Sequence, residues 1–278
     1  MDTSPITGGD FSCFLTQLQR EPAVLVRVAG TQGSVPREVG AWMAVFATST
    51  LGTIGGGRLE WDASQTARAL LIQTDAAPQT QRVPLGPSLG QCCGGVVHLA
   101  YEPVTAHDVA ALRQRWQAAR LPVALFGGGH VGRALVQALA PLPFQVHWYD
   151  SRDEVFPADL PAQVITEHSD PVQAAVADAP PGSRVLIMSF SHAEDLEVVD
   201  ACLRRRAQRD DLPLVGLIGS QTKWATFRRR LAQRGWSDEA LAGIVCPIGL
   251  PGIVGKQPEV IAASVAAQLL LDVSGRRG

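Results

Sequence analysis

The chain has 278 residues, a formal net charge of −2 at pH 7, and hydrophobic and charged fractions of 46% and 18%. These values are typical of a globular protein with one large or two ordinary domains, and they give no electrostatic reason to expect nucleic acid or a membrane as partner. The start of the chain lacks a signal-peptide pattern, no apolar run reaches transmembrane length, and five cysteines do not suggest a disulfide framework, so we expect a cytoplasmic protein.

The first part of the chain predicts a small mixed α+β domain over residues 1–103. Runs rich in β-branched and aromatic residues predict buried strands at 23–28, 43–46 and 96–101. One helix is expected near 61–72, between Gly-rich turns. Thr105 and Asp108 then form a capping-box pattern that opens a polar helix, which suits a connector between domains at 104–120.

From residue 121 to 278 the pattern changes to strands that alternate with helices. Short apolar strands are expected at 123–126, 145–149, 163–166, 184–188 and 214–218. Helical stretches are expected at 131–140, 171–177, 194–208, 222–234 and 259–273. This alternation favours βαβ units. The sequence therefore predicts an α/β protein in which a Rossmann-like, doubly wound parallel sheet follows the smaller α+β domain.

Two neighbouring thiols, Cys92 and Cys93, lie in the glycine-flanked segment Leu89-Gly90-Gln91-Cys92-Cys93-Gly94-Gly95. Glycine lets a backbone approach a ligand closely, which favours a chemical role for the thiols. Consecutive side chains of an extended segment point to opposite faces, so we expect one thiol to meet the ligand. A turn with two small buried residues and a strained vicinal disulfide are the alternatives, while the spacing of a zinc site is absent.

Lysine is rare in this chain, because only Lys223 and Lys256 stand among 24 basic residues. A coding bias toward arginine explains the rarity, yet both lysines lie beside glycine loops. A flexible ammonium group is a good partner for phosphate, so each lysine is a candidate ligand of an anion.

The segment Gly127-Gly128-Gly129-His130-Val131-Gly132 follows a predicted strand and opens a predicted helix, which is the context that the G-x-G-x-x-G pattern requires. Gly127 allows the turn, Gly129 admits a phosphate, and Gly132 permits close packing of the helix on the strand. Amide groups at the helix start are expected to hold an anion. Asp150 ends the second strand, where an acidic side chain binds ribose, and Arg152 is a candidate for an additional phosphate.

A catalytic set for hydride transfer is not evident around this loop. His130 belongs to the turn itself, and His192 has no partner in its local sequence, although an acid–base role for His192 stays open. A nucleotide or NAD(P) at the glycine loop, and with it an NAD(P)-dependent oxidoreductase, is therefore the alternative interpretation.

The ordered combination of segments resembles the XdhC/CoxI family, the accessory proteins of xanthine dehydrogenase that handle molybdenum cofactor. In the first half the resemblance rests on Gly33-Ser34-Val35-Pro36-Arg37, Gly40-Ala41-Trp42-Met43, Ile54-Gly55-Gly56-Gly57-Arg58-Leu59-Glu60 and the double-cysteine segment. In the second half it rests on the glycine loop, on 216–220 with Lys223, on 247–250 and on 258–264.

The resemblance implies an accessory protein rather than an enzyme. Such proteins bind molybdenum cofactor, a molybdopterin with a terminal phosphate, protect it while a cysteine desulfurase supplies a sulfido ligand, and deliver it to apo-xanthine dehydrogenase. Cys92 or Cys93 would then be the thiol near molybdenum, since soft thiolate suits such a metal centre. The other residues expected to contact the cofactor are Gln91, Arg37, Gly55, Gly56, Gly57, Glu60, Gly127, Gly129, His130, Gly132, Asp150, Lys223 and Lys256.

Some expectations have alternatives. Arg37 also suits a surface ion pair, and Glu60 also suits the orientation of a loop or the start of a helix. Family members commonly carry a histidine where this chain has Phe190, in Ser189-Phe190-Ser191-His192. A homodimer that encloses the cofactor is expected. A scaffold that binds apo-xanthine dehydrogenase without a small ligand is the remaining alternative.

Overall fold

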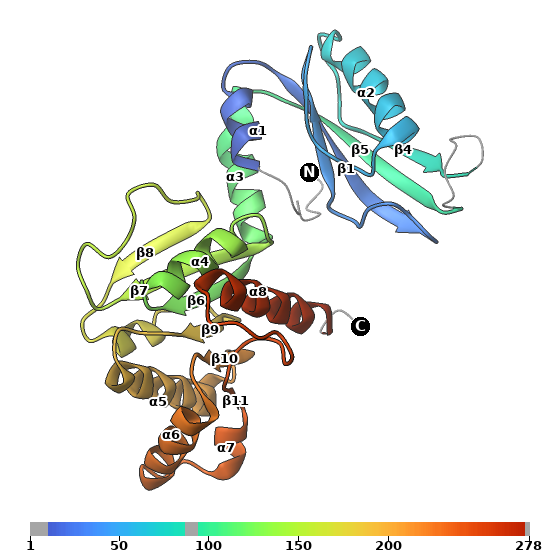
Figure 1. Cartoon of the computed structure of the whole chain (residues 1–278). Helices are drawn as coiled ribbons and strands as arrows, with labels where there is room; N and C mark the ends of the chain where they lie inside the picture. Colours follow the sequence, from blue (N-terminus) through green and yellow to red (C-terminus); the bar gives the residue numbers. More distant parts are fainter. Residues whose placement is uncertain (1–10, 87–93, 276–278) are drawn as a thin grey trace. The chain divides into compact units, whose positions relative to one another are not determined.

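The structure is a computed structural model that describes residues 11–86 and 94–275 of the chain. The chain divides into two compact units, Met1–Arg120 and Leu121–Gly278. The first unit carries an antiparallel sheet and the second a parallel sheet, each with helices packed on it (Figure 1). The fold is therefore the predicted combination of a smaller α+β part and a Rossmann-like α/β part.

The N-terminal unit is built on five strands in the order β3-β2-β1-β5-β4. These strands are β1 (Ala23–Gln32), β2 (Trp42–Val45), β3 (Thr50–Gly52), β4 (Gln79–Pro84) and β5 (Val96–Val104). The α-helices are α1 (Phe11–Leu18), α2 (Gly57–Leu71) and α3 (Val109–Ala118). A 3₁₀ turn at Ala106–Asp108 precedes α3, and Thr105 and Asp108 form the predicted capping box there.

Helices cover both faces of this antiparallel sheet. Side chains alternate along β1, so Val24 and Val26 lie on one face and Leu25 on the other. Helix α2 packs on the first face through apolar residues at helical spacing, while α1 and α3 pack on the second. Phe11 of α1 stacks on Trp116 of α3 with ring centroids 5.4 Å apart, so aromatic contacts join these two helices.

The C-terminal unit is built on six parallel strands in the order β11-β10-β9-β6-β7-β8. These are β6 (Leu121–Phe126), β7 (Phe144–Asp150), β8 (Val164–His168), β9 (Arg184–Ile187), β10 (Leu214–Leu217) and β11 (Ile244–Val245). The α-helices are α4 (His130–Leu139), α5 (His192–Arg209), α6 (Gln221–Gln233), α7 (Asp238–Ala242) and α8 (Pro258–Gly275). The stretch expected to be helical at 171–177 is a 3₁₀ helix, Val172–Val176.

Both faces of the parallel sheet are buried at its central strands β6, β9 and β10, as their nearly continuous apolar sequences require. Ala124 and Phe126 of β6 contribute to the core under α5, α6 and α7. Val123 and Leu125 contribute to the opposite core, under α4 and α8, which lie side by side (Figure 1). The strand order reverses between β6 and β9, because β7 and β8 follow on one side of β6 and β9 to β11 on the other. A ligand site of a Rossmann-like sheet is expected beyond the carboxyl ends of β6 and β9.

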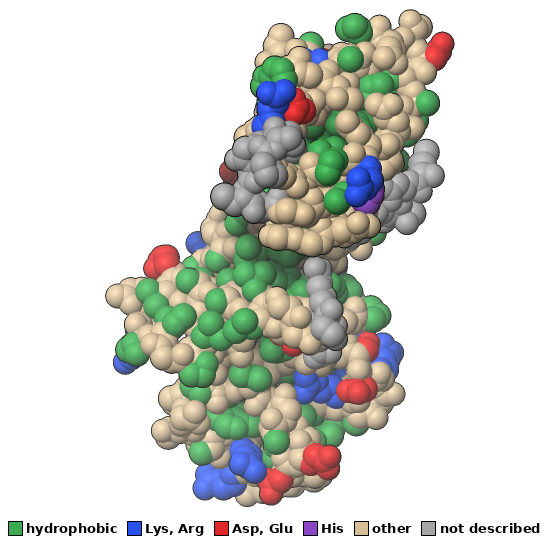
Figure 2. All heavy atoms as spheres, turned by 90° about the vertical axis from the view of Figure 1, so that its right-hand side faces the viewer, with side chains coloured by type: hydrophobic (Ala, Val, Ile, Leu, Met, Phe, Trp, Pro, Cys, Tyr) green, Lys and Arg blue, Asp and Glu red, His purple; other side chains and the backbone are tan. Residues whose placement is uncertain are grey.

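Helix α8 is unusually apolar. Among the described helices it is the one that is long and apolar enough to cross a membrane by length and composition. Of its 18 residues, 28% are buried inside the protein. Its buried side chains belong to the sheet core, and Asp272 pairs with Arg184 at the start of β9 at 2.9 Å. Figure 2 shows hydrophobic side chains over a broad area of the C-terminal unit.

Candidate functional site

The carboxyl ends of β6 and β9 meet at the point where the strand order reverses. The backbone N–H of Met188 donates to the carbonyl of Phe126 at 2.8 Å, which brings the loop after β9 against the glycine loop after β6. Ligands of open α/β sheets bind in the crevice that forms at such a point. The two loops therefore define the candidate site of this unit.

The glycines of the first loop have distinct structural roles. Gly127 has φ +119°, and a Cβ there would lie 2.0 Å from the carbonyl oxygen of Met188. A Cβ on Gly132 would lie 2.1 Å from the carbonyl oxygen of Gly127, so the third glycine permits the close packing of α4. Nothing lies within 4 Å of a Cβ on Gly129, the residue that precedes α4. This open side, next to the start of a helix, suits an anion.

The Asp150 carboxylate is buried and already holds several donors. Its Oδ2 accepts the Gly128 N–H at 2.5 Å, and both of its oxygens accept the Arg152 guanidinium at 2.9 Å. Its Oδ1 also accepts the backbone N–H of Arg152. Burial raises the pKa of Asp150, but these hydrogen bonds outweigh it and lower the pKa below its ordinary value. Asp150 thus supports the glycine loop and orients Arg152.

Arg152 stacks on Phe190, and we call this pair the clamp. The guanidinium carbon lies 4.6 Å from the centroid of the Phe190 ring, and the Phe190 side chain is 66% exposed. Glu194 joins the turn after β7 to the loop after β9, because it accepts the Ser151 hydroxyl at 2.7 Å and the Phe190 N–H at 3.1 Å. The clamp therefore stands beside the glycine loop in a fixed position.

Lys223 forms a buried ion pair near the same edge. Its Nζ lies 2.5 Å from Asp195 Oδ2 and donates to the Ile218 carbonyl at 2.9 Å. Asp195 also accepts the Ser189 N–H at 2.7 Å, so the pair joins the starts of α5 and α6. A phosphate at Lys223 would compete with these two partners. Nearby, the His192 ring packs edge-on against the Phe227 ring, with the ring centroids 6.4 Å apart.

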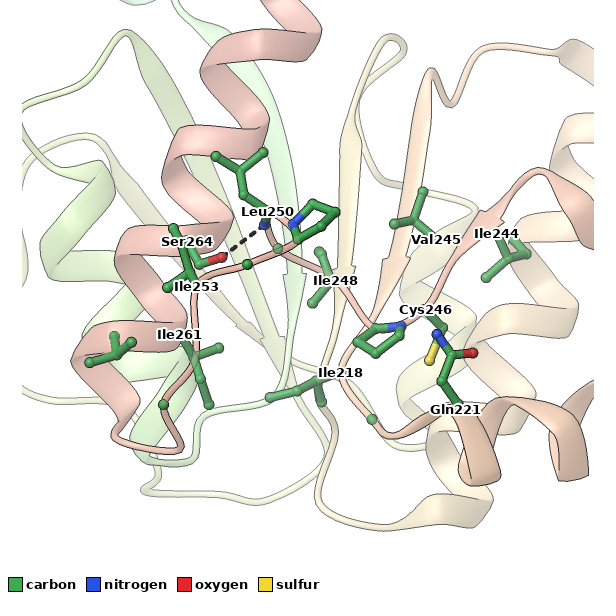
Figure 3. Close-up of a pocket in the computed structure, with 17 residues that line it drawn as sticks. Ile218, Gln221, Ile244, Val245, Cys246, Ile248, Leu250, Ile253, Ile261 and Ser264 are labelled. Carbon is green, nitrogen blue, oxygen red and sulfur yellow. Dashed lines mark hydrogen bonds between the residues drawn. The ribbon is translucent and has the colours of Figure 1, made fainter.

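A pocket of ≈ 680 Å³ lies beyond the carboxyl ends of β10 and β11 (Figure 3). Aliphatic side chains such as Ile218 and Ile248 line it, together with Gln221, Cys246 and Ser264. The segments 216–220, 247–250 and 258–264, which are far apart in the sequence, each contribute to this wall. Sequence reasoning did not place a pocket here, although all three segments carried the family resemblance.

One polar side chain of this pocket is hydrogen-bonded within the protein, and another is a neutral thiol. The Ser264 hydroxyl accepts the Leu250 N–H at 2.8 Å, as the dashed line in Figure 3 shows. Burial raises the pKa of the Cys246 thiol to about 11, with Lys223 and Asp195 exerting opposite and smaller effects. Cys246 is therefore a protonated thiol at neutral pH, and the pocket presents a largely uncharged surface.

A second cluster of predicted residues meets in the N-terminal unit. The Glu60 carboxylate accepts the Thr53 hydroxyl and the N–H groups of Ile54 and Gly55. Burial raises the pKa of Glu60, but these hydrogen bonds, with one from the Gly56 backbone, lower it below the ordinary value. The sequence leaves three roles open for Glu60: contact with the cofactor, orientation of a loop and the start of a helix. This geometry is that of a loop-orienting residue.

Arg37 packs near the same loop. Its Nε lies 3.5 Å from Glu38 Oε2, and its Nη1 donates to the Thr53 carbonyl at 3.4 Å. Gly55, Gly56 and Gly57 have φ values of +129°, +80° and +63°, a run that only glycine adopts without strain. The structure thus brings Arg37, the three glycines and Glu60 together in one unit.

The remaining predicted residues are not part of these clusters. Gln91, Cys92 and Cys93 lie outside the described residues, so their roles stay predictions. Lys256 is exposed in the loop before α8. Across residues 11–86 and 94–275, no group of three His, Cys, Asp or Glu side chains is placed to hold a metal ion.

Comparisons with known proteins give a consistent result. A family model described as the XdhC Rossmann domain matches residues 123–269, and one described as the XdhC and CoxI family matches residues 17–83. The uncharacterized protein YqeB of Escherichia coli (strain K12) is 27% identical over 264 residues, which cover 91% of this chain and 44% of YqeB. The chain thus spans less than half the length of that relative.

A solved structure has a similar fold. The crystal structure described as a xanthine dehydrogenase from Bacillus halodurans matches with a TM-score of 0.70 and 20% identity, over 95% of this chain and 96% of that one. At this identity the likeness concerns the fold.

Proposed function

The chain belongs to the XdhC family, and from this premise we propose that it is an accessory protein of a xanthine dehydrogenase. In this proposal it binds molybdenum cofactor as cargo and protects it while a cysteine desulfurase supplies the terminal sulfido ligand. It then inserts the cargo into apo-xanthine dehydrogenase. The protein acts in the cytoplasm as a homodimer that encloses the cargo.

The open side of the glycine loop is the observation that carries this proposal. Gly129 leaves space at the start of α4, where backbone N–H groups and the helix dipole favour an anion. The terminal phosphate of the cargo is such an anion. In addition, Arg152 Nη1 has no hydrogen-bond partner among the described residues, so it supports a phosphate at this position.

We assign the molybdenum end of the cargo to the double-cysteine segment. The dithiolene and sulfido chemistry of a molybdenum centre favours soft sulfur ligands, and Cys92 and Cys93 are a pair of neighbouring thiols with glycines on either side. The buried Cys202 and the protonated Cys246 are poorer candidates, because burial raises the pKa of both thiols, to about 12 and about 11.

The state of Asp150 weighs against a dinucleotide-dependent oxidoreductase. In that class an acidic side chain at this position binds the ribose hydroxyls. Here the carboxylate accepts the Gly128 N–H and a two-pronged contact from Arg152, so a ribose would have to displace them.

Cargo retention tests the proposal directly. We expect protein purified from a host that makes the cofactor to carry molybdopterin, measured by mass spectrometry of the released ligand. The double variant Cys92→Ala and Cys93→Ala should lose most of it. Cys13→Ala, which removes an exposed thiol of the same unit, is the matched control and should retain it. Equal retention in all three proteins would remove the thiol role, and a wild-type protein without pterin would remove the proposed function.

A further inference from the structure

We infer that the clamp of Arg152 and Phe190 is a subsite for the planar ring of a phosphorylated ligand, and that it also excludes dinucleotides by occupying Asp150. The inference rests on the proposed function, which it deepens by naming the ligand class that the glycine loop accepts. That class is a ring system with one terminal phosphate, recognised without contact to a ribose diol.

The position of Phe190 supports a role in stacking. The residue follows β9 at the point where the strand order reverses, two residues after Met188, whose carbonyl oxygen a Cβ on Gly127 would meet at 2.0 Å. Arg152 covers the ring at 4.6 Å, yet 66% of the side chain is exposed. A flat ring bound at the glycine loop can therefore stack on Phe190, as bases stack on exposed aromatic side chains in other proteins.

The position of Arg152 supports a role in donating a hydrogen bond to a phosphate. Its Nε and Nη2 groups each donate to Asp150 at 2.9 Å, which fixes the plane of the guanidinium. Its Nη1 group has no hydrogen-bond partner within the described part of the chain. An arginine held in this way is preorganised to meet a phosphate oxygen, because little side-chain freedom remains to be lost.

The same contacts explain the exclusion of dinucleotides. A ribose diol needs the Asp150 carboxylate as acceptor, but the guanidinium and the Gly128 N–H already occupy it. Removal of Arg152 would return the carboxylate to the state that binds ribose. The inference thus predicts opposite effects of one substitution on two ligand classes.

An arginine stacked on an exposed ring is by itself an ordinary surface contact, and the chain offers a matched control. On α2, Arg58 lies 4.8 Å from the ring of Trp61, which is 56% exposed, and pairs with Asp62 at 2.9 Å. Arg58, Trp61 and Asp62 thus repeat the arginine and aromatic ring of the clamp together with a carboxylate in the role of Asp150. They do not stand at the carboxyl edge of a parallel sheet.

The test uses full-length protein made in a host that lacks the cofactor. Three probes are titrated anaerobically by calorimetry: molybdenum cofactor released from a molybdoenzyme, GMP and NADH. Phe190→Leu should weaken binding of the first two about tenfold, the scale of losing one stacking contact. Phe190→Trp should restore binding, and Trp61→Leu should leave it unchanged. Arg152→Ala should weaken binding of the cofactor, whose pterin carries no ribose diol, and tighten NADH binding.

The outcomes separate the inference from the proposed function. The clamp is wrong if Phe190→Leu binds the cofactor and GMP as tightly as wild type, or if Arg152→Ala shifts the affinities for cofactor and NADH in the same direction. Binding of GMP but not cofactor, with the expected dependence on Phe190, would support the clamp and remove the proposed function. Binding of cofactor that depends on neither Phe190 nor Arg152 would support the proposed function and remove the clamp. A wild-type protein that binds none of the probes would overturn both.

Discussion

Substituting the third glycine of the loop tests how α4 is held against the sheet. Gly132→Ala would place a Cβ 2.1 Å from the Gly127 carbonyl oxygen, whereas ordinary contact begins near 3.4 Å. The oxygen has little room to move, because it accepts the Trp148 indole N–H at 2.9 Å. Helix α4 must therefore shift away from the loop by about an ångström or lose this hydrogen bond.

The expected cost follows from these contacts. Overpacking typically costs about 1–3 kcal/mol, and alanine regains about 1 kcal/mol of helix propensity over glycine. The strained carbonyl also places its hydrogen bond to Trp148 at risk, worth about 1 kcal/mol. We expect the free energy of unfolding of the C-terminal unit to fall by about 2 kcal/mol. In a unit of this size that corresponds to about 4–8 °C in the thermal midpoint.

Gly129→Ala is the matched control, because a Cβ there meets nothing within 4 Å and φ is −72°. Its thermal midpoint, measured by circular dichroism and calorimetry, should stay close to wild type, while its retention of cargo should fall because the methyl group occupies the open side. Equal midpoints for Gly132→Ala and wild type would refute the packing argument. Equal losses of stability in both variants would refute the division of roles between the two glycines.

Three further predictions concern ionisable groups. Because the pKa of Asp150 is below 3.8 in the folded chain, its stabilisation is complete above that pH and is lost as pH falls through the folded value. Asp150→Asn should therefore lower the free energy of unfolding by about 2 kcal/mol at pH 7 and by less at pH 3, as urea titrations would show; a constant difference would contradict this. Cys246, with a thiol pKa of about 11, should be alkylated about a hundredfold more slowly at pH 8 than a thiol of pKa 9.0. Peptide mass spectrometry would measure this, and rapid labelling at pH 8 would count against it. Glu60→Gln should raise hydrogen exchange at the Ile54 and Gly55 amides, because the charged acceptor is lost, and unchanged protection would contradict the loop-orienting role.

Local sequence patterns predict most of the C-terminal fold because its central strands are buried and most of its helices are long. The same approach does not find β11, which has two residues, or β4, where the exposed segment Gln79–Pro84 shows no apolar alternation. Strand β4 exists because it pairs with β5, as in the register of Gln79 with Tyr101. Helix α1 has apolar residues at helical spacing, but its eight residues are stabilised by tertiary contacts with α3 and the sheet.

The candidate site is predictable in part. Glycine spacing places Gly127 and Gly132 correctly in the turn and the packing contact, and places Asp150 at the end of its strand. The occupation of Asp150 by Arg152 depends on the turn after β7, which no spacing rule describes. The pocket beside Cys246 is assembled from three distant segments, so it requires the fold.

The measurement that tests the account most directly is the transfer of cargo. Protein purified from a cofactor-producing host is mixed with apo-xanthine dehydrogenase, and molybdenum and pterin are quantified on each protein after separation. The account predicts that both leave this chain together and appear on the dehydrogenase, with Gly129→Ala carrying less of each. Purified wild-type chain without molybdenum or pterin, from a host that makes both, would contradict it.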